Sequence, residues 1–219
     1  MQNVIAIDGP AASGKGTAAK KLAAHLDYAL LDTGKLYRAA AYLVKDAQED
    51  DHLEAKAIEA ARQLKDHADL NGVLGNPQLG SEEIARKASI ISAIAQVRSI
   101  LFDLQRDFAL SPPALSDGSL AKGAILDGRD IGMVICPDAA LKFYITASPE
   151  VRANRRFIEL RDQGKQVIYD DILADVIARD ERDMNRKIAP LIPAPDAVII
   201  DSSDLTIDEV FNQILSHIG

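Results

Sequence analysis

The sequence has little cysteine and no excess of positive charge. Its one cysteine, Cys136, excludes an internal disulfide and suits a reducing compartment. Because this thiol stands alone beside Pro137, we interpret it as a packing residue rather than a catalytic one. A formal net charge of −8 and a pI of about 5.0 argue against a general nucleic-acid binder and against a protein that binds acidic membranes.

Long apolar runs and several common signatures are also missing. No run of 18 apolar residues occurs, so no membrane-spanning helix is predicted. No targeting segment stands before the first predicted strand, and we therefore expect a cytoplasmic protein. The chain has no Asn-Lys-x-Asp guanine signature, which argues against a GTPase, and no internal repeat.

The start of the chain carries the clearest motif. An apolar run, Val4 to Ile7, leads into a Gly-x-x-x-x-Gly-Lys loop and then into a helical pattern from Lys15 to Leu26. This order is typical of a P-loop, in which backbone N–H groups and the lysine hold phosphate at a helix N-terminus. The alternative is an ordinary glycine turn. The predicted nucleotide-binding residues are Gly9, Ala11, Ala12, Ser13, Gly14, Lys15, Gly16 and Thr17.

One position departs from the usual P-loop. Gly16 follows the lysine where a serine or threonine commonly binds magnesium, and Thr17 comes one place later. We therefore expect Mg²⁺ to be held mainly by phosphate oxygens and water. This variant resembles the nucleoside monophosphate kinases.

Strand and helix patterns alternate along the rest of the chain. With 219 residues, 47% of them hydrophobic, the chain can bury one good core and a small appendage. The alternation predicts an α/β fold with a central parallel sheet covered on both faces and with ligands at the carboxyl ends of the strands. The predicted strands are 28–31, 124–127, 140–145 and 197–200, and the predicted helices are 35–45, 54–65, 149–162, 171–186 and one after the capping box Thr206-x-x-Glu209.

The middle of the chain has a different pattern. Residues 67–80 hold three glycines and further breakers, so we predict a loop there. Ser81 suits an N-cap, and an apolar stripe from Ile84 to Phe108 predicts a long helix that Ser111 and the prolines after it end. Residues 114–123 are predicted to be a flexible surface insertion.

Arginines gather in two late helices. Arg152, Arg155 and Arg156 are neighbours on one predicted helix, as are Arg179, Arg182 and Arg186 on the next. Like charges at this spacing repel unless an anion lies between them, and guanidinium groups suit phosphate oxygens. The alternative is a solvated face on which Asp180, Glu181 and Asp183 neutralise the arginines.

The abundance of cations also favours one kind of acceptor. A phosphate acceptor is already anionic and needs several cations but no general base. An alcohol acceptor would need a carboxylate base, for which Asp130 is the candidate. The sequence therefore favours a nucleoside monophosphate.

Four motifs in order resemble the bacterial cytidylate (CMP/dCMP) kinases, and the resemblance covers nearly the whole chain. The motifs are Asp8–Thr17, Leu31–Arg38, Asp127–Gly132, and Arg179–Arg186 followed by Ala189-Pro190-Leu191. The resemblance implies a three-layer P-loop kinase fold: a single domain over residues 1–219, with a reduced monophosphate-binding insertion at about 52–110 and a lid at about 156–168. It implies ATP and Mg²⁺ as cofactors and CMP and dCMP as substrates. We expect a monomer, and the net charge argues against binding to nucleic acid or membrane.

The resemblance also implies roles for single residues. Lys15, Arg129, Arg186, Arg155 and Arg156 would be catalytic, with the last two meeting ATP at the lid. Asp127 would orient magnesium through water, although it could be only a turn carboxylate. The substrate site would hold phosphate with Thr33, Arg38, Arg129 and Arg186, the pentose with Arg179 and Asp183, and the cytosine edge with Ser89, Arg98 and Asp130.

The chain departs from the family pattern at three places. Ala95 replaces a proline; since nine residues of a straight helix turn by about 900°, Ser89 and Arg98 would face opposite sides. We therefore predict a break between Ile91 and Val97. Residues 67–80 are too few for the family's small antiparallel sheet, and residues 111–123 form a longer segment than the family has.

Two other functions compete with this hypothesis. One is a P-loop kinase with an alcohol acceptor, such as a nucleoside or a shikimate-like substrate. The other is a nucleotide-binding regulatory module or GTPase, which should bind nucleotide without converting any monophosphate. The preference among CMP, dCMP and UMP stays open.

Overall fold

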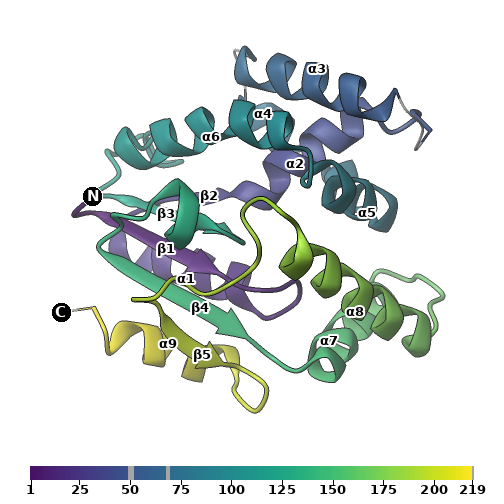
Figure 1. Cartoon of the computed structure of the whole chain (residues 1–219). Helices are drawn as coiled ribbons and strands as arrows, with labels where there is room; N and C mark the ends of the chain where they lie inside the picture. Colours follow the sequence, from purple (N-terminus) through teal and green to yellow (C-terminus); the bar gives the residue numbers. More distant parts are fainter. Residues whose placement is uncertain (49–51, 68–69, 219) are drawn as a thin grey trace. The chain divides into compact units, whose positions relative to one another are not determined.

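The protein forms two compact units. The structure is a computed structural model that describes residues 1–48, 52–67 and 70–218 (Figure 1). Residues 1–31 and 109–219 form one unit, here called the sheet unit, and residues 32–108 form the other, here called the helical unit. The predicted division into one domain with an insertion and a lid stays a prediction.

Five strands in the order β2-β3-β1-β4-β5 form the sheet. They are β1 (Val4–Asp8), β2 (Ala29–Asp32), β3 (Ala124–Gly128), β4 (Leu141–Thr146) and β5 (Val198–Asp201). β1 pairs in parallel with both β3 and β4, and β4 pairs in parallel with β5. The predicted α/β fold with a central parallel sheet is confirmed, and β1, which precedes the P-loop, lies in its middle.

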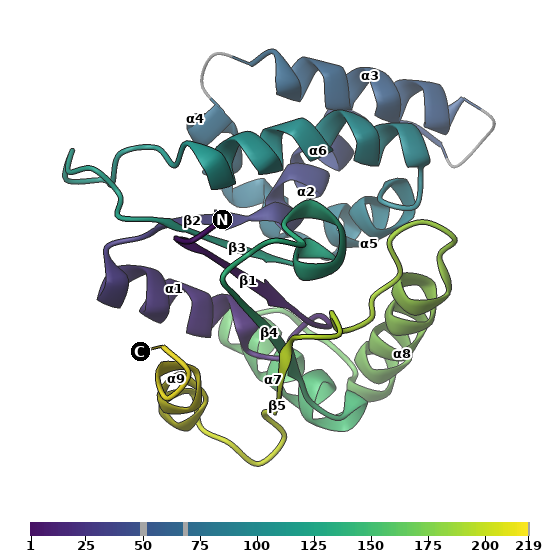
Figure 2. The same ribbon diagram turned by 60° about the vertical axis from the view of Figure 1, so that its left-hand side comes forward.

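Side chains of β1 alternate between the two faces of the sheet. Ile5 and Ile7 pack with α1 (Lys15–Leu26) and α9 (Ile207–Leu215), which lie on the same face (Figure 2). Asp8 points to the other face and accepts hydrogen bonds from the start of η2, a single π-helical turn (Ile131–Ile135). The central strand thus has an apolar face and a face that ends in a carboxylate.

Two long helices complete the sheet unit. α7 (Pro149–Asp162) and α8 (Tyr169–Asn185) pack on each other through a small apolar core of Ala153, Leu160, Ile172 and Val176. Ser148 caps α7 by accepting from Val151 N, and Pro149 is its first residue, as predicted. The capping box of Thr206 and Glu209 at the start of α9 is also confirmed.

The helical unit follows β2. Its helices are α2 (Thr33–Leu43), α3 (Leu53–Lys65), α4 (Leu70–Leu74), the 3₁₀ helix η1 (Pro77–Gly80), α5 (Glu82–Ile91) and α6 (Ala95–Leu110). The predicted break is confirmed, because α5 ends at Ile91 and α6 begins at Ala95. In residues 32–48, 52–67 and 70–108, strand structure is confined to Asp32 at the end of β2.

The prediction of a loop over residues 67–80 is wrong for most of the segment that the structure describes. α4 and η1 lie there, and the breakers have local uses. Asn76 caps η1 by accepting from Gln78 N, and Pro77 is its first residue. The buried Leu79 ties this turn to its unit.

Residues 114–123 contain no helix or strand, in agreement with the predicted surface insertion. Asp117 closes a turn there by accepting from Ser119 N. None of the helices in the described part of the chain combines the length and the hydropathy that crossing a bilayer requires.

Candidate active site

The loop after β1 has the backbone of a phosphate-binding loop. Gly9 has φ 148°, and a Cβ there would lie 2.0 Å from the Ile145 carbonyl oxygen, so a side chain does not fit. Gly14 has φ 86° and caps α1 in the left-handed conformation. Thr17 N and Ala18 N both donate to Gly14 O, so the helical hydrogen bonds begin there. Helix N-termini of this kind bind anions through the N–H groups of their first turn.

Lys15 lies beside the end of β3. Its Nζ is 3.6 Å from Asp127 Oδ1, and both side chains are buried. A Cβ at position 16 would lie only 3.1 Å from Asp127 Oδ2. Gly16, which stands where the usual motif has serine or threonine, therefore leaves room for this carboxylate. Sequence reasoning noted the missing hydroxyl at position 16 but not this close approach.

A groove of about 320 Å³ runs along the loop. Its lining residues are Ala12, Gly14, Lys15, Gly16, Thr17, Lys20, Arg155, Arg156 and Glu159. Arg155 and Arg156 of α7 thus lie where the sequence places the donor nucleotide. Arg156 pairs with Glu159 at 2.5 Å, whereas Arg155 donates to Ser202. Burial lowers the pKa of Arg155 from its usual value.

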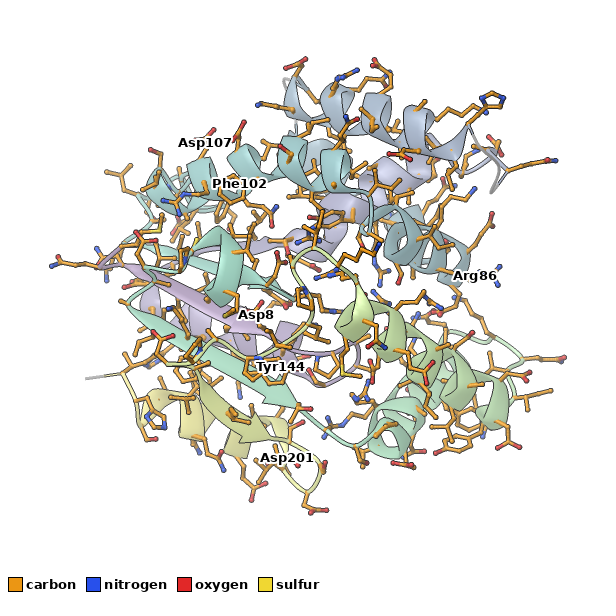
Figure 3. All side chains as sticks on the ribbon, viewed as in Figure 1. Asp8, Arg86, Phe102, Asp107, Tyr144 and Asp201 are labelled. Carbon is orange, nitrogen blue, oxygen red and sulfur yellow. The ribbon has the colours of Figure 1, made fainter. Side chains whose placement is uncertain are left out.

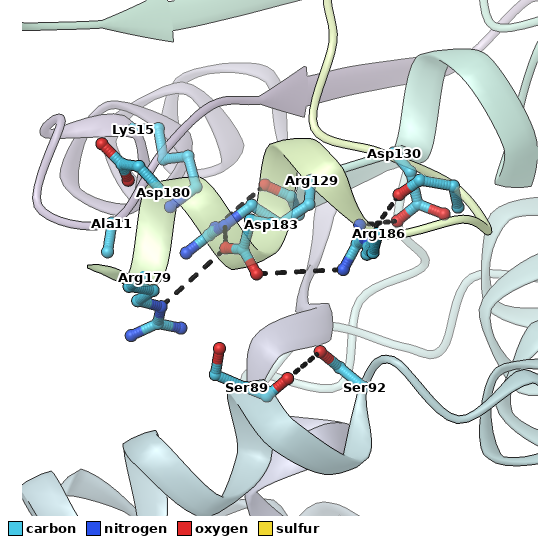
Figure 4. Close-up of polar contacts among 12 residues, drawn as sticks. Ala11, Lys15, Ser89, Ser92, Arg129, Asp130, Arg179, Asp180, Asp183 and Arg186 are labelled. Atoms are coloured by element: carbon cyan, nitrogen blue, oxygen red, sulfur yellow. Dashed lines mark hydrogen bonds and ion pairs between the residues drawn. The ribbon is translucent and has the colours of Figure 1, made fainter. Parts of the chain in front are cut away.

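Three of the predicted arginines surround one carboxylate, that of Asp183, near the C-terminal end of α8 (Figure 4). Asp183 Oδ2 lies 3.2 Å from Arg129 Nε and 3.9 Å from Arg179 Nε, and its Oδ1 lies 4.0 Å from Arg186 Nη1. Burial raises the pKa of Asp183, but Arg129, Arg179 and Arg186 outweigh it and bring the pKa below the usual value. The carboxylate is therefore ionised and bound by cations.

Arg186 also reaches the residue predicted to read the base. Its Nη2 lies 3.9 Å from Asp130 Oδ1, and its Nε donates to Ala189 O at 2.5 Å. The residue caps the C-terminus of α8, so the chain turns at the point where this guanidinium is fixed. The side chains of Arg186 and Asp183 are about 5% exposed, which argues against the alternative of a solvated face.

Asp180 neutralises one arginine, as that alternative supposed, but in a buried position rather than on a solvated face. It forms a two-bond pair with Arg152 of α7, Nη1 to Oδ1 at 3.1 Å and Nη2 to Oδ2 at 2.5 Å. Arg152 Nε also donates to Ala147 O, and its Nη1 donates to Ala11 O in the P-loop. Of the α7 arginines, Arg152 is therefore a buried connector rather than a lining residue of the groove.

Asp8 is a site residue that sequence reasoning missed. Its two oxygens accept from Ile131 N and Gly132 N, each at 2.8 Å, and so fix the turn that carries Arg129 and Asp130. Burial raises the pKa of Asp8 to about 7; the two N–H bonds oppose this rise, and Asp130 and Asp127 add to it. An aspartate at the end of an otherwise apolar run was the available signal.

Tyr144 lies next to Asp8 on the neighbouring strand (Figure 3). Burial raises the pKa of its phenol, while the charge of Arg129 lowers it. Sequence reasoning gave this residue no role either.

The remaining predicted residues belong to the helical unit. Thr33 is buried at the first position of α2, and Arg38 of the same helix donates from Nη1 to Leu79 O at 2.9 Å. Ser92, in the break between α5 and α6, connects the two predicted base-site residues: its Oγ donates to Ser89 O (Figure 4), and its carbonyl accepts from Arg98 Nη1 at 3.3 Å. Arg98 also lies over the Tyr37 ring, with its Cζ 5.5 Å from the ring centroid.

The residues fit magnesium in one limited way. No group of three or more His, Cys, Asp or Glu that could hold a metal occurs among the residues that the structure describes. Mg²⁺ in nucleotide sites commonly takes one or two carboxylates together with phosphate oxygens and water. The buried carboxylate of Asp127, beside Lys15 and Gly16, matches that donor set.

Comparisons with known proteins agree with the motifs. A family model described as cytidylate kinase matches residues 5–219. A cytidylate kinase of Rhodopseudomonas palustris (strain ATCC BAA-98 / CGA009) is 50% identical over 205 residues, which are 94% of this chain and 90% of that protein. One of Paramagnetospirillum magneticum is 48% identical over 219 residues, 100% of this chain and 99% of that protein.

The fold also resembles a solved structure. An uncharacterized protein from Eubacterium ventriosum ATCC 27560 aligns with a TM-score of 0.53 at 16% identity and covers 99% of this chain and 98% of its own. At this identity the likeness concerns the fold alone.

Proposed function

The chain belongs to the cytidylate kinase family, and from this premise we propose how its residues act. ATP gives its γ-phosphoryl group to CMP or dCMP, which yields ADP and CDP or dCDP. One observation carries the proposal: the guanidinium groups of Arg129, Arg179 and Arg186 gather around Asp183 at distances of 3.2 to 4.0 Å. Three cations around one carboxylate suit a site that receives further negative charge.

The P-loop holds the donor. We assign the ATP phosphates to the N–H groups at the start of α1 and to Lys15, because the loop conformation and the adjoining groove suit a polyphosphate. Gly9, Ala11, Ala12, Ser13, Gly14, Gly16 and Thr17 supply the backbone of this site. Arg155 and Arg156 face the same groove from α7 and meet the nucleotide there.

Arg129 and Arg186 act on the transferred group. Phosphoryl transfer passes through a loose transition state whose charge lies on the equatorial oxygens, so cations held in place are the main aid to the reaction. Arg129 is fixed by its bond to Gly128 O and Arg186 by its bond to Ala189 O, which limits the reorganisation that either needs. The phosphate of CMP is itself the nucleophile, and no general base is required.

Asp183 and Arg179 serve the pentose, and Asp130 serves the base. An ionised Asp183 accepts from sugar hydroxyls, and Asp130 accepts from the exocyclic amine of cytosine. We assign Ser89 and Arg98 to the base, and Thr33 and Arg38 to the monophosphate, from the family motifs. Of the residues given these roles, Arg38 and Arg179 are partly exposed and the others are buried.

Asp127 is the proposed protein partner of Mg²⁺. When bound, Mg²⁺ would neutralise charge on the phosphate groups of ATP. Asp127 would help to hold it, which suits Gly16 at the position of the usual hydroxyl. A monomeric state and a cytoplasmic location remain predictions from the sequence.

Release of ADP in a coupled assay tests the function. Purified protein, ATP and Mg²⁺ are combined with CMP, dCMP, UMP, AMP, GMP or cytidine in turn. We expect the highest kcat/KM with CMP and dCMP and no turnover of cytidine, which would be the substrate of an alcohol kinase. Absence of turnover with every pyrimidine monophosphate would refute the proposal.

Asp130→Ala tests the base site. Loss of a hydrogen bond to a charged group should raise KM for CMP about tenfold to a hundredfold, while KM for ATP stays within about twofold. Asp208→Ala is the control, because Asp208 is an exposed aspartate in a surface pair with Lys21. Equal losses for both substrates would remove Asp130 from the base site.

A further inference from the structure

Ser202 joins three segments of the sheet unit. It follows β5 directly and is 1% exposed. Its backbone N–H donates to Thr146 O at the end of β4 at 2.8 Å. Its hydroxyl donates to Ser13 O in the P-loop at 2.9 Å and accepts from Arg155 Nη1 at 3.0 Å. Its carbonyl accepts from Arg155 Nη2 at 2.6 Å.

These bonds fix the direction of the hydroxyl. A serine hydroxyl has one hydrogen and two lone pairs. Because its hydrogen goes to Ser13 O, its oxygen faces Arg155 as an acceptor. The two oxygens of Ser202 therefore hold both terminal nitrogens of the guanidinium, in a position set by the P-loop carbonyl.

Arg155 reaches from this anchor to the groove. It lines the groove together with Gly14, Lys15 and Gly16, and its Nη1 would lie 3.9 Å from a Cβ at Gly14. An arginine side chain loses much rotamer freedom when it is ordered. An arginine that is already held binds a ligand with a smaller entropic penalty.

We infer that Ser202 is a positioning residue for ATP, which acts by holding the Arg155 guanidinium at the P-loop groove. The inference rests on the proposed function in one respect, that the groove receives ATP. Ser202 itself is covered by protein. Its effect on the nucleotide is transmitted through Arg155.

Ser202→Ala removes one acceptor of Arg155 and the donor to Ser13 O. We expect KM for ATP to rise about fivefold to tenfold, as for the loss of one hydrogen bond, while KM for CMP stays within twofold. Ser202→Thr, which restores the hydroxyl, should bring KM for ATP back to within twofold. Ser216→Ala is the matched control, because Ser216 is an exposed serine whose hydroxyl also donates to a backbone carbonyl; it should change neither KM.

A merely structural role predicts a different result. It would lower the melting temperature with no change in KM for ATP, or raise KM for both substrates equally, and either outcome overturns the inference. If Ser202→Ala does not fold, Ser202→Cys replaces it, since a thiol of similar size is a much weaker donor and acceptor. The same outcomes then decide.

The path through Arg155 is tested by a double-mutant cycle. In an Arg155→Ala background, Ser202→Ala should raise KM for ATP by less than twofold. A full fivefold to tenfold rise in that background would show that Ser202 acts without Arg155 and would overturn the inference.

Binding of a non-hydrolysable ATP analogue, measured by calorimetry, separates this inference from the proposed function. If wild-type protein converts no pyrimidine monophosphate but Ser202→Ala still weakens analogue binding fivefold to tenfold, the function fails and the positioning role stands. If CMP is converted normally and Ser202→Ala changes neither KM nor analogue affinity, only the positioning role fails.

Discussion

A buried lysine of the helical unit has other partners than two buried cations of the sheet unit. In the sheet unit, Lys15 faces Asp127 and Arg186 faces Asp130 and Asp183. In the helical unit, the ammonium of Lys87 donates to three main-chain carbonyls, Val44 O at 3.1 Å, Lys45 O at 2.6 Å and Ala47 O at 2.7 Å.

The difference teaches what each kind of cation does. A phosphate oxygen can replace a side-chain carboxylate as the partner of a cation, so Lys15 and Arg186 remain available to a ligand. A carbonyl belongs to the backbone, so Lys87 holds together the chain that leaves α2. We expect substitutions of Lys15 and Arg186 to change catalysis, and a substitution of Lys87 to change the free energy of unfolding.

Lys15→Ala should give the largest effect. The change removes the P-loop cation from the phosphates, and we expect kcat to fall about a thousandfold, as when a main oxyanion donor is lost. Lys21→Ala is the control on the same helix, because Lys21 is half exposed and pairs with Asp208; its kcat should stay within twofold. A near-normal kcat for Lys15→Ala, with the circular dichroism spectrum unchanged, would refute the expectation that a buried cation facing a carboxylate serves catalysis.

Asp8 extends the comparison to a buried carboxyl group of the sheet unit. Its partners are two N–H groups, and its pKa is raised from 3.8 to about 7, chiefly by burial. Between these pH values the folded state binds a proton that the unfolded state has lost. The stability from this group is complete below about pH 4 and is lost as the pH rises through about 7, by about 4 kcal/mol in all.

Asp8→Asn, which stays neutral, should remove this dependence. The dependence is measured by urea unfolding at several pH values between 4.5 and 8, as the difference in free energy of unfolding between wild type and variant. Asp208→Asn, at an exposed aspartate, is the control. Wild type should lose stability relative to Asp8→Asn as the pH rises. A difference that is constant with pH would mean that Asp8 is already ionised at pH 4.5.

Much of this arrangement was predictable from local sequence. The helix Lys15–Leu26 has its predicted bounds, and the start of α7 follows the Ser148-Pro149 signal. In these two cases the signal lies within a few residues of the feature. The break between α5 and α6 was predicted only because the family resemblance places Ser89 and Arg98 in one base site, whereas the apolar stripe alone predicted one long helix.

What failed depends on distant partners. α4 and η1 are too short to be stable alone, so residues 70–80 gave only breaker signals. Asp180 was considered only as one of three acidic residues that neutralise the arginines of both late helices, and nothing in the sequence singled out Arg152, 28 positions earlier, as its partner. Ser202 and Ser13 are 189 positions apart, and Asp8 and Ile131 are 123 apart. Such pairings follow from strand order, which the periodicity of one sequence does not contain.

Lys87→Met tests the other half of the comparison. The change leaves three carbonyls, one in a buried and two in partly buried hydrogen bonds, without their shared donor. We expect a loss of about 3 kcal/mol in the free energy of unfolding. With both substrates saturating, kcat should stay within twofold. Lys45→Met, at an exposed lysine paired with Asp46, is the control in the same unit. An unchanged urea midpoint together with a large fall in kcat would reverse the roles that we assign to the two kinds of cation.

Thr206→Ala should give the smallest effect. It tests whether catalysis is sensitive to any substitution in the sheet unit or only to substitutions of its buried cations. Thr206 is an exposed residue of the sheet unit, and its hydroxyl caps α9, whose Val210 and Ile214 lie in the core against the sheet. Loss of the cap should lower the free energy of unfolding by about 1 kcal/mol and leave both KM values unchanged, while Thr206→Ser should restore most of the loss. A purely structural effect inside the sheet unit would show that the sensitivity of catalysis lies with the cations that face carboxylates. If kcat falls for Thr206→Ala but not for Thr206→Ser, loss of a single capping hydrogen bond in the sheet unit is enough to change catalysis. The sensitivity of kcat would then belong to the whole unit and not to its cations.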